Sequence, residues 1–294
     1  MLSTIAALAM SLIGSGSAPK DAEIVVSTGE SVQFFNARTL KVDGYYHGDH
    51  LWISPGAAFR KGNAIYLISN EGFRLTFKVD KDQHITFESS KEEPRLKPFN
   101  LSLGLAISQD GSRMFGIVDQ KGIGSLETGK KAMRVIHPLP PSIEAYFPSI
   151  SKDGRYLAYS LYDNKMQADH EGERYRLRVL DLVSKKVFSV GEGASACWSQ
   201  DSNSLLVRHG DNLAGMSWSE YEFSGKRFKE RRWADLENEA SSLAYWDDGV
   251  VALGYIGPKH TYGLVFYKKD GTLYRKLPIP DADSGSTVAV IDGE

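Results

Sequence analysis

A short sequence pattern recurs along the chain and constrains its fold more than any other feature. A serine, a variable residue, an aspartate and a glycine lie between two apolar stretches, as in Leu105–Ile117 and Pro148–Ser160. A third copy, Ala196–Val207, has serine in place of the glycine, and degenerate copies lie at Ala57–Leu67 and Leu243–Leu253. Asp-Gly favours a tight hairpin because glycine adopts positive φ without strain and aspartate hydrogen-bonds nearby backbone. Each copy therefore predicts two antiparallel strands joined by a tight turn.

The copies are evenly spaced. Their turn positions are separated by 49, 43, 48 and 47 residues and are Gly62, Gly111, Gly154, Ser202 and Gly249. Two further strands follow each hairpin, for example Tyr175–Asp181 and Val187–Val190. A unit of about 45 residues with four strands and no helical period is typical of a β-propeller blade.

The sixth blade has to be assembled from both ends of the chain. Residues Glu23–Ser27, Val32–Phe35 and Leu40–Val42 predict three strands, but a first strand and its turn are missing before them. The missing strand matches Thr287–Ile291, which an Asp-Gly dipeptide follows. Pairing the two ends removes the open edges of an unclosed ring. The sequence therefore predicts an all-β, six-bladed β-propeller with four antiparallel strands per blade, formed as one domain by residues 19–294, with its first blade closed by the C-terminal strand.

The Ser-x-Asp-Gly pattern and the apolar strand after it resemble the WD40-like (PD40) repeat of the TolB-type propellers. The pattern is clearest at Ser108–Ile117 and Ser151–Tyr159, and the resemblance extends over residues 22–294. True WD40 repeats differ, since the one Trp-Asp pair, Trp246-Asp247, falls at a hairpin turn without a Gly-His dipeptide. TolB itself carries an α/β domain ahead of its propeller that has no counterpart in this sequence. The resemblance therefore implies a fold and not a role in the Tol system.

Composition argues against several classes of partner. The formal net charge is −2, which gives no general attraction to nucleic acid or to anionic membranes. Cys197 is the single cysteine, so no intramolecular disulfide can form, and its apolar neighbours predict a small buried side chain. We expect a monomer.

The N-terminal residues resemble an export signal. An apolar run over residues 1–13 is followed by small residues up to Ala18, and it is too short to span a bilayer. No basic residue precedes the run, so an uncleaved N-terminal anchor is the alternative. We expect residues 1–18 to be a signal peptide and the mature chain to be periplasmic or secreted, without a transmembrane span.

Common catalytic motifs are missing from the sequence. It has no Gly-x-Ser-x-Gly elbow, no P-loop and no His-Glu-x-x-His. Asp281–Gly285 begins like a calcium loop but lacks the later ligands, which favours a polar connection. The long segment 162–174 is either a lid or partner-binding loop or a polar excursion from the ring.

Histidines and acidic residues concentrate in the segments predicted to join second to third strands and one blade to the next, which share one face. These residues are His47, Asp49, His50, His137, Asp163, Asp169, His170, His209, Asp211 and His260, whereas His84 belongs to the opposite face. Imidazoles and carboxylates that converge could hold a divalent metal or perform acid–base chemistry. The alternative is that long loops simply collect polar residues around a wide rim. Aromatic residues near the same face could stack on sugars or anchor a peptide, and they are Tyr45, Tyr46, Trp52, Tyr146, Phe147, Tyr162 and Tyr262.

Two functions follow as hypotheses. The first is an exported, non-enzymatic binding or scaffold propeller that recognises a protein, peptide or saccharide on its loop-rich face. Its candidate ligand-binding residues are His47, Asp49, His50, Asp163, His209, Asp211, His260 and Tyr262. The second is a metal-assisted polysaccharide lyase or hydrolase with a histidine-lined site at the axial mouth, since oligogalacturonate lyases resemble TolB-type propellers with a histidine-ligated metal there. Three or more of His47, His50, His137, His209 and His260 meeting at one point would favour the enzyme.

Overall fold

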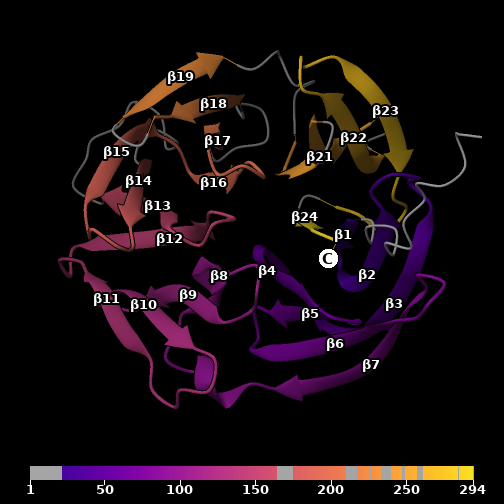
Figure 1. Ribbon diagram of the computed structural model, residues 1–294, viewed down its shortest axis with the longest axis horizontal. Helices are drawn as coiled ribbons and strands as arrows, with labels where there is room; N and C mark the ends of the chain where they lie inside the picture. Colours follow the sequence, from indigo (N-terminus) through magenta and orange to yellow (C-terminus); the bar gives the residue numbers. More distant parts are fainter. Residues whose placement is uncertain are drawn as a thin grey trace, which may run out of the picture.

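Six four-stranded sheets stand like blades around a central axis (Figure 1). The computed structural model describes residues 22–163, 175–209, 217–224, 227–232, 240–246, 249–256, 261–283 and 285–293. Strands adjacent in each sheet are antiparallel, and the innermost strands contact one another around the whole ring. The predicted six-bladed propeller is confirmed, whereas the predicted signal peptide, residues 1–18, lies outside the described residues.

In each blade the strands follow one another from the axis outward. Blade 1 contains β24 (Thr287–Ile291), β1 (Glu23–Ser27), β2 (Gly29–Asn36) and β3 (Val42–Leu51); blade 2 contains β4 (Ile53–Lys61), β5 (Ala64–Ser69), β6 (Phe73–Val79) and β7 (Ile85–Glu92). Blade 3 contains β8 (Leu105–Ile107), β9 (Arg113–Val118), β10 (Gly122–Glu127) and β11 (Arg134–Pro138); blade 4 contains β12 (Ile143–Ile150), β13 (Tyr156–Asp163), β14 (Tyr175–Asp181) and β15 (Val187–Glu192). Blade 5 contains β16 (Ser195–Trp198), β17 (Ser204–His209), β18 (Ser217–Phe223) and β19 (Phe228–Arg232); blade 6 contains β20 (Ser242–Trp246), β21 (Gly249–Tyr255), β22 (Tyr262–Lys268) and β23 (Leu273–Pro278).

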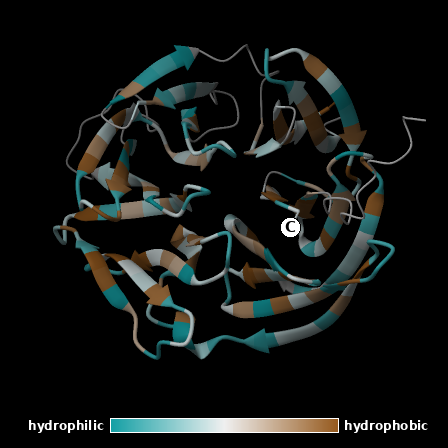
Figure 2. Cartoon of the chain, in the orientation of Figure 1, coloured by the Kyte–Doolittle hydropathy of each residue, from teal (hydrophilic) through white to brown (hydrophobic). Residues whose placement is uncertain are grey.

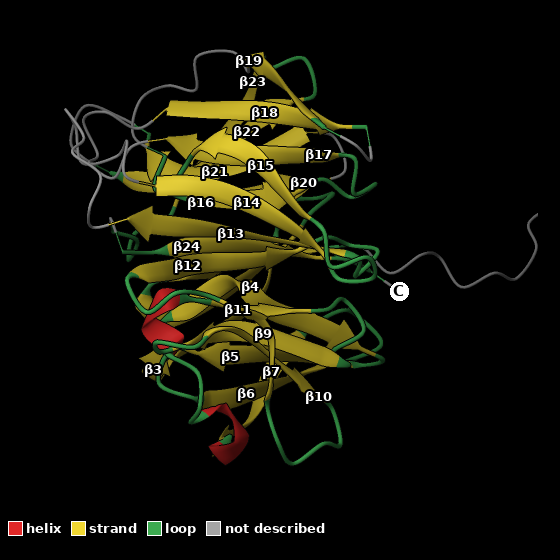
Figure 3. Cartoon of the chain, turned by 90° about the vertical axis from the view of Figure 1, so that its left-hand side faces the viewer, coloured by secondary structure: helices red, strands yellow, loops and turns green. Residues whose placement is uncertain are grey.

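The ring has two different faces. The turns between first and second strands lie on one face, which we call the turn face, and the blade-to-blade connections lie on the other, the connection face. Two 3₁₀ helices, η1 (Pro94–Leu96) and η2 (Leu101–Leu103), belong to the connection between blades 2 and 3. In the side view of Figure 3 they lie on the side away from the C-terminus, which follows β24 at the turn face. No helix among the described residues is long and apolar enough to cross a membrane.

The C-terminal strand closes blade 1 as predicted. β24 pairs with β1 in an antiparallel register that aligns Ile291 with Glu23 and Thr287 with Ser27. Val288 is fully buried and Ile291 is nearly so. The Thr287 hydroxyl also donates to the carbonyl of Ile53 at 2.8 Å, which ties the closing strand to blade 2.

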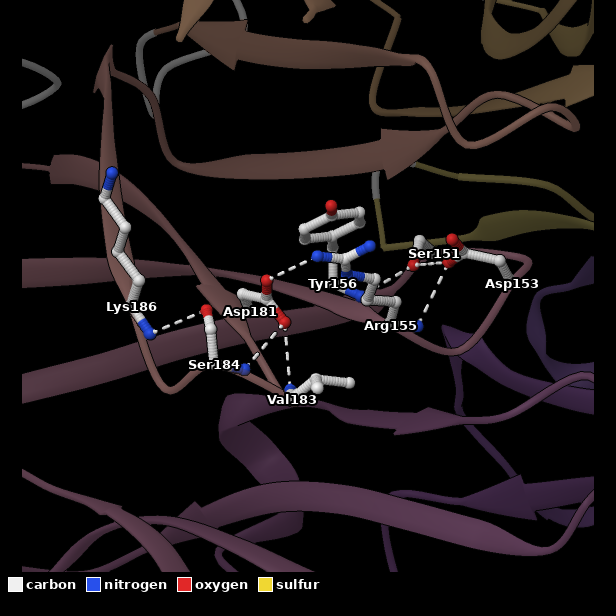
Figure 4. A network of polar contacts seen from close by, with 8 residues as sticks. All are labelled: Ser151, Asp153, Arg155, Tyr156, Asp181, Val183, Ser184 and Lys186. Atoms are coloured by element: carbon white, nitrogen blue, oxygen red, sulfur yellow. Dashed lines mark hydrogen bonds and ion pairs between the residues drawn. The ribbon is translucent and has the colours of Figure 1, made fainter. Parts of the chain in front are cut away.

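The repeated serine and aspartate build the tight turns. In blade 3 the Ser108 hydroxyl donates to Asp110 at 2.6 Å and accepts the backbone N–H of Arg113 at 2.9 Å, while Gly111 has φ of 67°. Blade 4 repeats this arrangement with Ser151 and Asp153 (Figure 4). Blade 5 repeats it as well, with Ser199, Asp201 and Ser202. The pattern detected in the sequence is therefore a structural device of the hairpin.

The turns between third and fourth strands share a second device. Asn36, Asp80, Asp181 and Asp270 occupy this position in blades 1, 2, 4 and 6, and each side chain accepts a backbone N–H from two to four residues ahead. Asp181 also accepts a hydrogen bond from Arg155 Nη2 at 3.0 Å, across the edge of blade 4 (Figure 4).

Apolar layers between neighbouring blades form the core. Phe34 of blade 1 packs edge-on against Phe77 of blade 2, with ring centroids 4.8 Å apart. Between blades 4 and 5, Trp198 stacks on Tyr156 and donates its indole N–H to the carbonyl of Ser149 at 3.1 Å. The outermost strand β19 is mostly hydrophilic, as Figure 2 shows, and its Lys229, Glu230 and Arg231 side chains are exposed.

Two predicted connections are strands instead. β3 continues through residues 45–50, so His47, Asp49 and His50 lie in the fourth strand of blade 1 and not in the connection after it. β11 includes His137, and β12 begins at Ile143, which shortens the predicted connection 137–146 to four residues, 139–142. Polar residues with a glycine in the first stretch and prolines in the second made them resemble loops, but pairing with neighbouring strands decides their conformation.

Candidate functional site

A cavity of about 790 Å³ runs along the axis. The innermost strands of all six blades line it, together with residues at both ends of these strands. Figure 1 shows this axis end-on. A cavity of this size at the centre of a closed ring is the default place for a ligand.

A polar cluster crosses the axis at the turn face. Asp292 accepts hydrogen bonds from Gln109 Nε2 at 3.0 Å and from Lys152 Nζ at 2.8 Å. Gln109 and Lys152 occupy the variable position of the Ser-x-Asp-Gly pattern in blades 3 and 4, and Asp292 follows the closing strand of blade 1. The three side chains therefore join three blades across one end of the cavity.

Trp52 marks the other end. It lies in the connection between β3 and β4, lines the cavity and keeps 42% of its surface exposed. A Cβ at Gly29 would lie 2.6 Å from its Cε2 atom, and a Cβ at Gly285 would lie 2.7 Å from its Cζ3 atom. Two glycines from distant parts of the sequence therefore give the indole a place that larger residues would block. Its backbone carbonyl accepts the N–H of Asn70 at 2.7 Å, which fixes the connection.

Phe147 lines the same cavity in an unusual backbone conformation. Its φ is 49°, at an irregularity in β12 where the register with β13 shifts between Tyr146 and Ser149. A bulky residue at positive φ is strained, and such strain concentrates at functional positions. The Arg208 guanidinium lies over the Phe147 ring, 5.9 Å from its centroid. Trp52, Phe147 and Arg208 thus form an aromatic and cationic part of the cavity wall.

Hydroxyl groups and one thiol complete much of the wall. Ser54, Ser149, Ser195, Ser241, Ser242 and Thr287 all line the cavity. Cys197 lines it too, but burial raises the pKa of its thiol to about 12, so it stays protonated at neutral pH. A protonated thiol is a poor nucleophile. The wall therefore offers hydrogen-bonding groups and apolar contact.

The predicted site residues that the structure describes lie away from this cavity. His47 and Asp49 are exposed on the outermost strand of blade 1, and His50 follows in the same strand. Asp163 ends β13 and His209 ends β17. Tyr262 is buried at the start of β22, with its ring centroid 4.3 Å from that of Tyr255. Asp211 and His260 lie outside the described residues, and none of the described candidates lines the axial cavity.

The histidines of the described part of the chain do not form a common metal site. Burial lowers the pKa of His137 and of His209, which lie in blades 3 and 5. Among the residues described, one group has metal-ligand spacing, and it is Asp80, Asp82 and His84 in an exposed turn of blade 2. Asp80 there already accepts the backbone N–H groups of Asp82 and His84, which stabilises the turn.

Sequence reasoning found part of the cavity wall and missed part. Trp52 and Phe147 were among the predicted aromatics, whereas Gln109, Lys152 and Asp292 were noticed only as turn residues. Arg60, which also lines the cavity, has the sequence context of an ordinary charged strand end. The signal that could have identified them is their shared position next to the tight turns, at the inner end of each blade.

Comparisons with known proteins agree on the fold. No protein-family model matches the chain, and no curated protein sequence matches it. Among solved structures, TolB from Acinetobacter baumannii is similar with a TM-score of 0.57 and 13% identity over 91% of this chain, which spans 66% of that TolB's length. A putative TolB from Agrobacterium tumefaciens has a TM-score of 0.54 and 16% identity, and the match covers 95% of this chain and 99% of that protein. The β-propeller domain of Myceliophteria thermophila Cps50 (Swd1) has a TM-score of 0.52 and 12% identity, and the match covers 87% of this chain and 82% of that domain. The fold is thus that of a TolB-like, WD40-like propeller.

Proposed function

We propose that this chain is a non-enzymatic binding propeller that holds a protein, peptide or saccharide ligand at the connection-face mouth of its axial cavity. The observation that carries the proposal is Trp52, a partly exposed indole fixed between Gly29 and Gly285 at the edge of that cavity. An exposed tryptophan held in one place gives contact area at little entropic cost, which is why tryptophan is enriched among residues that dominate binding. The face is the one predicted from the sequence, and Trp52 is among the aromatic residues predicted near it, whereas the described histidine and aspartate candidates do not line the cavity.

Other features support the same function. The cavity wall combines aromatic rings, among them Trp52 and Phe147, with several hydroxyls, and this combination suits sugar rings or an extended peptide. The small net charge favours such ligands over nucleic acid. We further propose that the protein is a monomer. The signal-like residues 1–18 support its location in the periplasm or outside the cell. A metal-assisted lyase or hydrolase has no specific observation in its favour among the described residues.

Replacement of Trp52 by alanine should weaken ligand binding about tenfold or more, because a central aromatic contact contributes at least about 1.4 kcal/mol. We would select ligands for the full chain from an oligosaccharide array and from a random peptide library, and measure affinities by calorimetry. Tyr45→Ala is the matched control, since Tyr45 is 54% exposed but does not line the cavity. Equal affinity of Trp52→Ala and the unsubstituted chain for every selected ligand would refute the proposed mouth, as would failure of both selections.

A further inference from the structure

Arg60 is a buried cation at the turn-face end of the axial cavity. It lies next to the last residue of β4, lines the cavity, and only 5% of its surface is exposed. Its Nε donates to the carbonyl of Gly62 at 3.3 Å. Its Nη1 and Nη2 are both buried, and neither has a hydrogen-bond partner within the described part of the chain. The terminal nitrogens of a buried guanidinium group are rarely without hydrogen-bond partners, because burial of an unpaired charge costs free energy.

The other cations of the cavity wall are already engaged. Lys152 pairs with Asp292 at 2.8 Å, Arg113 Nη2 donates to the carbonyl of Gly154 at 2.8 Å, and Arg208 lies over the Phe147 ring. Arg60 is thus the cation of this wall whose terminal nitrogens lack a partner among the described residues.

The carboxylates of the wall are engaged as well. Asp110 accepts from the hydroxyls of Ser108 and Ser112, and Asp153 accepts from Ser151 Oγ at 2.5 Å. Asp292 is held by Gln109 and Lys152. The hydrogen bonds to Asp110 hold its pKa below the ordinary value, so its charge persists, but it is directed into its own turn. The protein supplies no free oxyanion for Arg60 in the part of the cavity that the structure describes.

We propose that Arg60 anchors an anion subsite, which takes a carboxylate or phosphate group of a ligand at the turn-face end of the cavity. A guanidinium presents parallel N–H donors that match two oxygens of either group, so one oxyanion would satisfy both orphaned nitrogens at once. Burial strengthens such a pair, because water is excluded from it.

The subsite is separate from the aromatic mouth. Trp52 immediately precedes β4 and Arg60 is near the end of that strand, so the two lie at opposite ends of the cavity. β4 is irregular, with Ile53 opposite Ser69 and Arg60 opposite Ile65, so the two ends of the strand are about four regular strand residues apart, roughly 13 Å. The proposal therefore goes beyond the proposed function, and it holds whether or not Trp52 contacts a ligand.

The test is calorimetric titration of the full chain with acetate, succinate and inorganic phosphate at millimolar concentration and low ionic strength. We expect saturable binding of at least one of these anions at a single site. Tighter binding of acetate or succinate would indicate a carboxylate ligand, and tighter binding of phosphate would indicate a phosphate ligand. Arg60→Met should weaken this binding more than about tenfold, and Arg60→Lys should weaken it less, because a lysine keeps the charge but loses the paired donors. Lys61→Met is the matched control, since it removes the same charge from an exposed neighbour and should leave binding unchanged. Trp52→Ala should also leave anion binding unchanged, which separates this test from that of the mouth.

Thermal unfolding adds a readout that a purely structural arginine would not give. Without an anion, Arg60→Met should melt at the same temperature as the unsubstituted chain or higher, because an unpaired buried charge has been removed. With the bound anion, the unsubstituted chain should melt at a higher temperature while Arg60→Met should not respond. The proposal is overturned if none of the three anions binds saturably, if Arg60→Met and Arg60→Lys bind as tightly as the unsubstituted chain, or if Arg60→Met melts well below it.

Discussion

Deletion of residues 286–294 should leave the ring open and remove most of the stability of the protein. The deletion takes away β24, the innermost strand of blade 1, whose Val288 and Ile291 side chains are 0% and 4% exposed. Burial of one such side chain contributes about 1.5–3 kcal/mol, so the pair contributes roughly 3–6 kcal/mol. A whole domain has only about 5–15 kcal/mol to lose. The truncated chain would also expose the edge of β1 and the inner surfaces of blades 2 and 6, which favours aggregation.

Addition of the missing strand as a peptide makes this prediction specific. Thermal unfolding followed by circular dichroism should show a large drop in melting temperature for the truncated chain. A synthetic peptide of residues 286–294 should restore part of the lost stability, whereas the same peptide with Val288→Asp should not, because it places a charge in the layer between blades 1 and 6. A truncated chain that melts like the full chain would contradict the closure.

The fold was predictable because its determinants are local. Ser108, Asp110 and Gly111 form a hydrogen-bonded turn within six residues, so the sequence pattern and the structure coincide. The same holds for the closing strand, because blade 1 lacked a first strand in the sequence and only one segment could supply it. Strand ends were harder to predict. β3 runs through His47 and Gly48, which have low strand propensity, because its pairing with β2 stabilises it.

The candidate site was less predictable because long-range packing builds it. Trp52 owes its position to Gly29 and Gly285. Both glycines are distant from Trp52 in the sequence, and they are still more distant from each other. Arg60 is followed by Lys61, and the pair suggests a solvated strand end, yet Arg60 is buried and Lys61 is exposed. Neither the position of Trp52 nor the burial of Arg60 can be inferred from the few residues around it in the sequence. The predicted histidine set followed from loop membership alone, which says nothing about convergence on one point.

Replacement of Asp181 by asparagine should destabilise the protein by about 2 kcal/mol near neutral pH, because charge-assisted hydrogen bonds to a buried carboxylate are lost or weakened. Asp181 is 3% exposed and accepts from Arg155 Nη2 at 3.0 Å and from the backbone N–H groups of Val183 and Ser184 at 2.9 and 3.2 Å (Figure 4). Arg155 is half exposed, so solvent screening reduces its share of the effect. Asp270→Asn is the matched control. Asp270 holds the same turn position in blade 6 without an arginine partner among the described residues, and its loss should matter much less.

The stabilising effect of Asp181 should depend on pH. The hydrogen bond from Arg155, followed by those from the backbone of Val183 and Ser184, holds the pKa of Asp181 well below its usual range in the folded protein. In the unfolded chain the aspartate has a pKa of about 3.9, so its carboxylate binds a proton at a higher pH than in the folded protein. The contribution of Asp181 is fully present above the unfolded pKa and is lost as the pH falls toward the folded pKa. The free energies of unfolding of Asp181→Asn and of the unsubstituted chain, measured by chemical denaturation, should thus differ most near neutral pH, and the difference should shrink progressively as the pH falls below about 4. A difference that stayed constant down to strong acid would show that the charge of Asp181 does not contribute to stability.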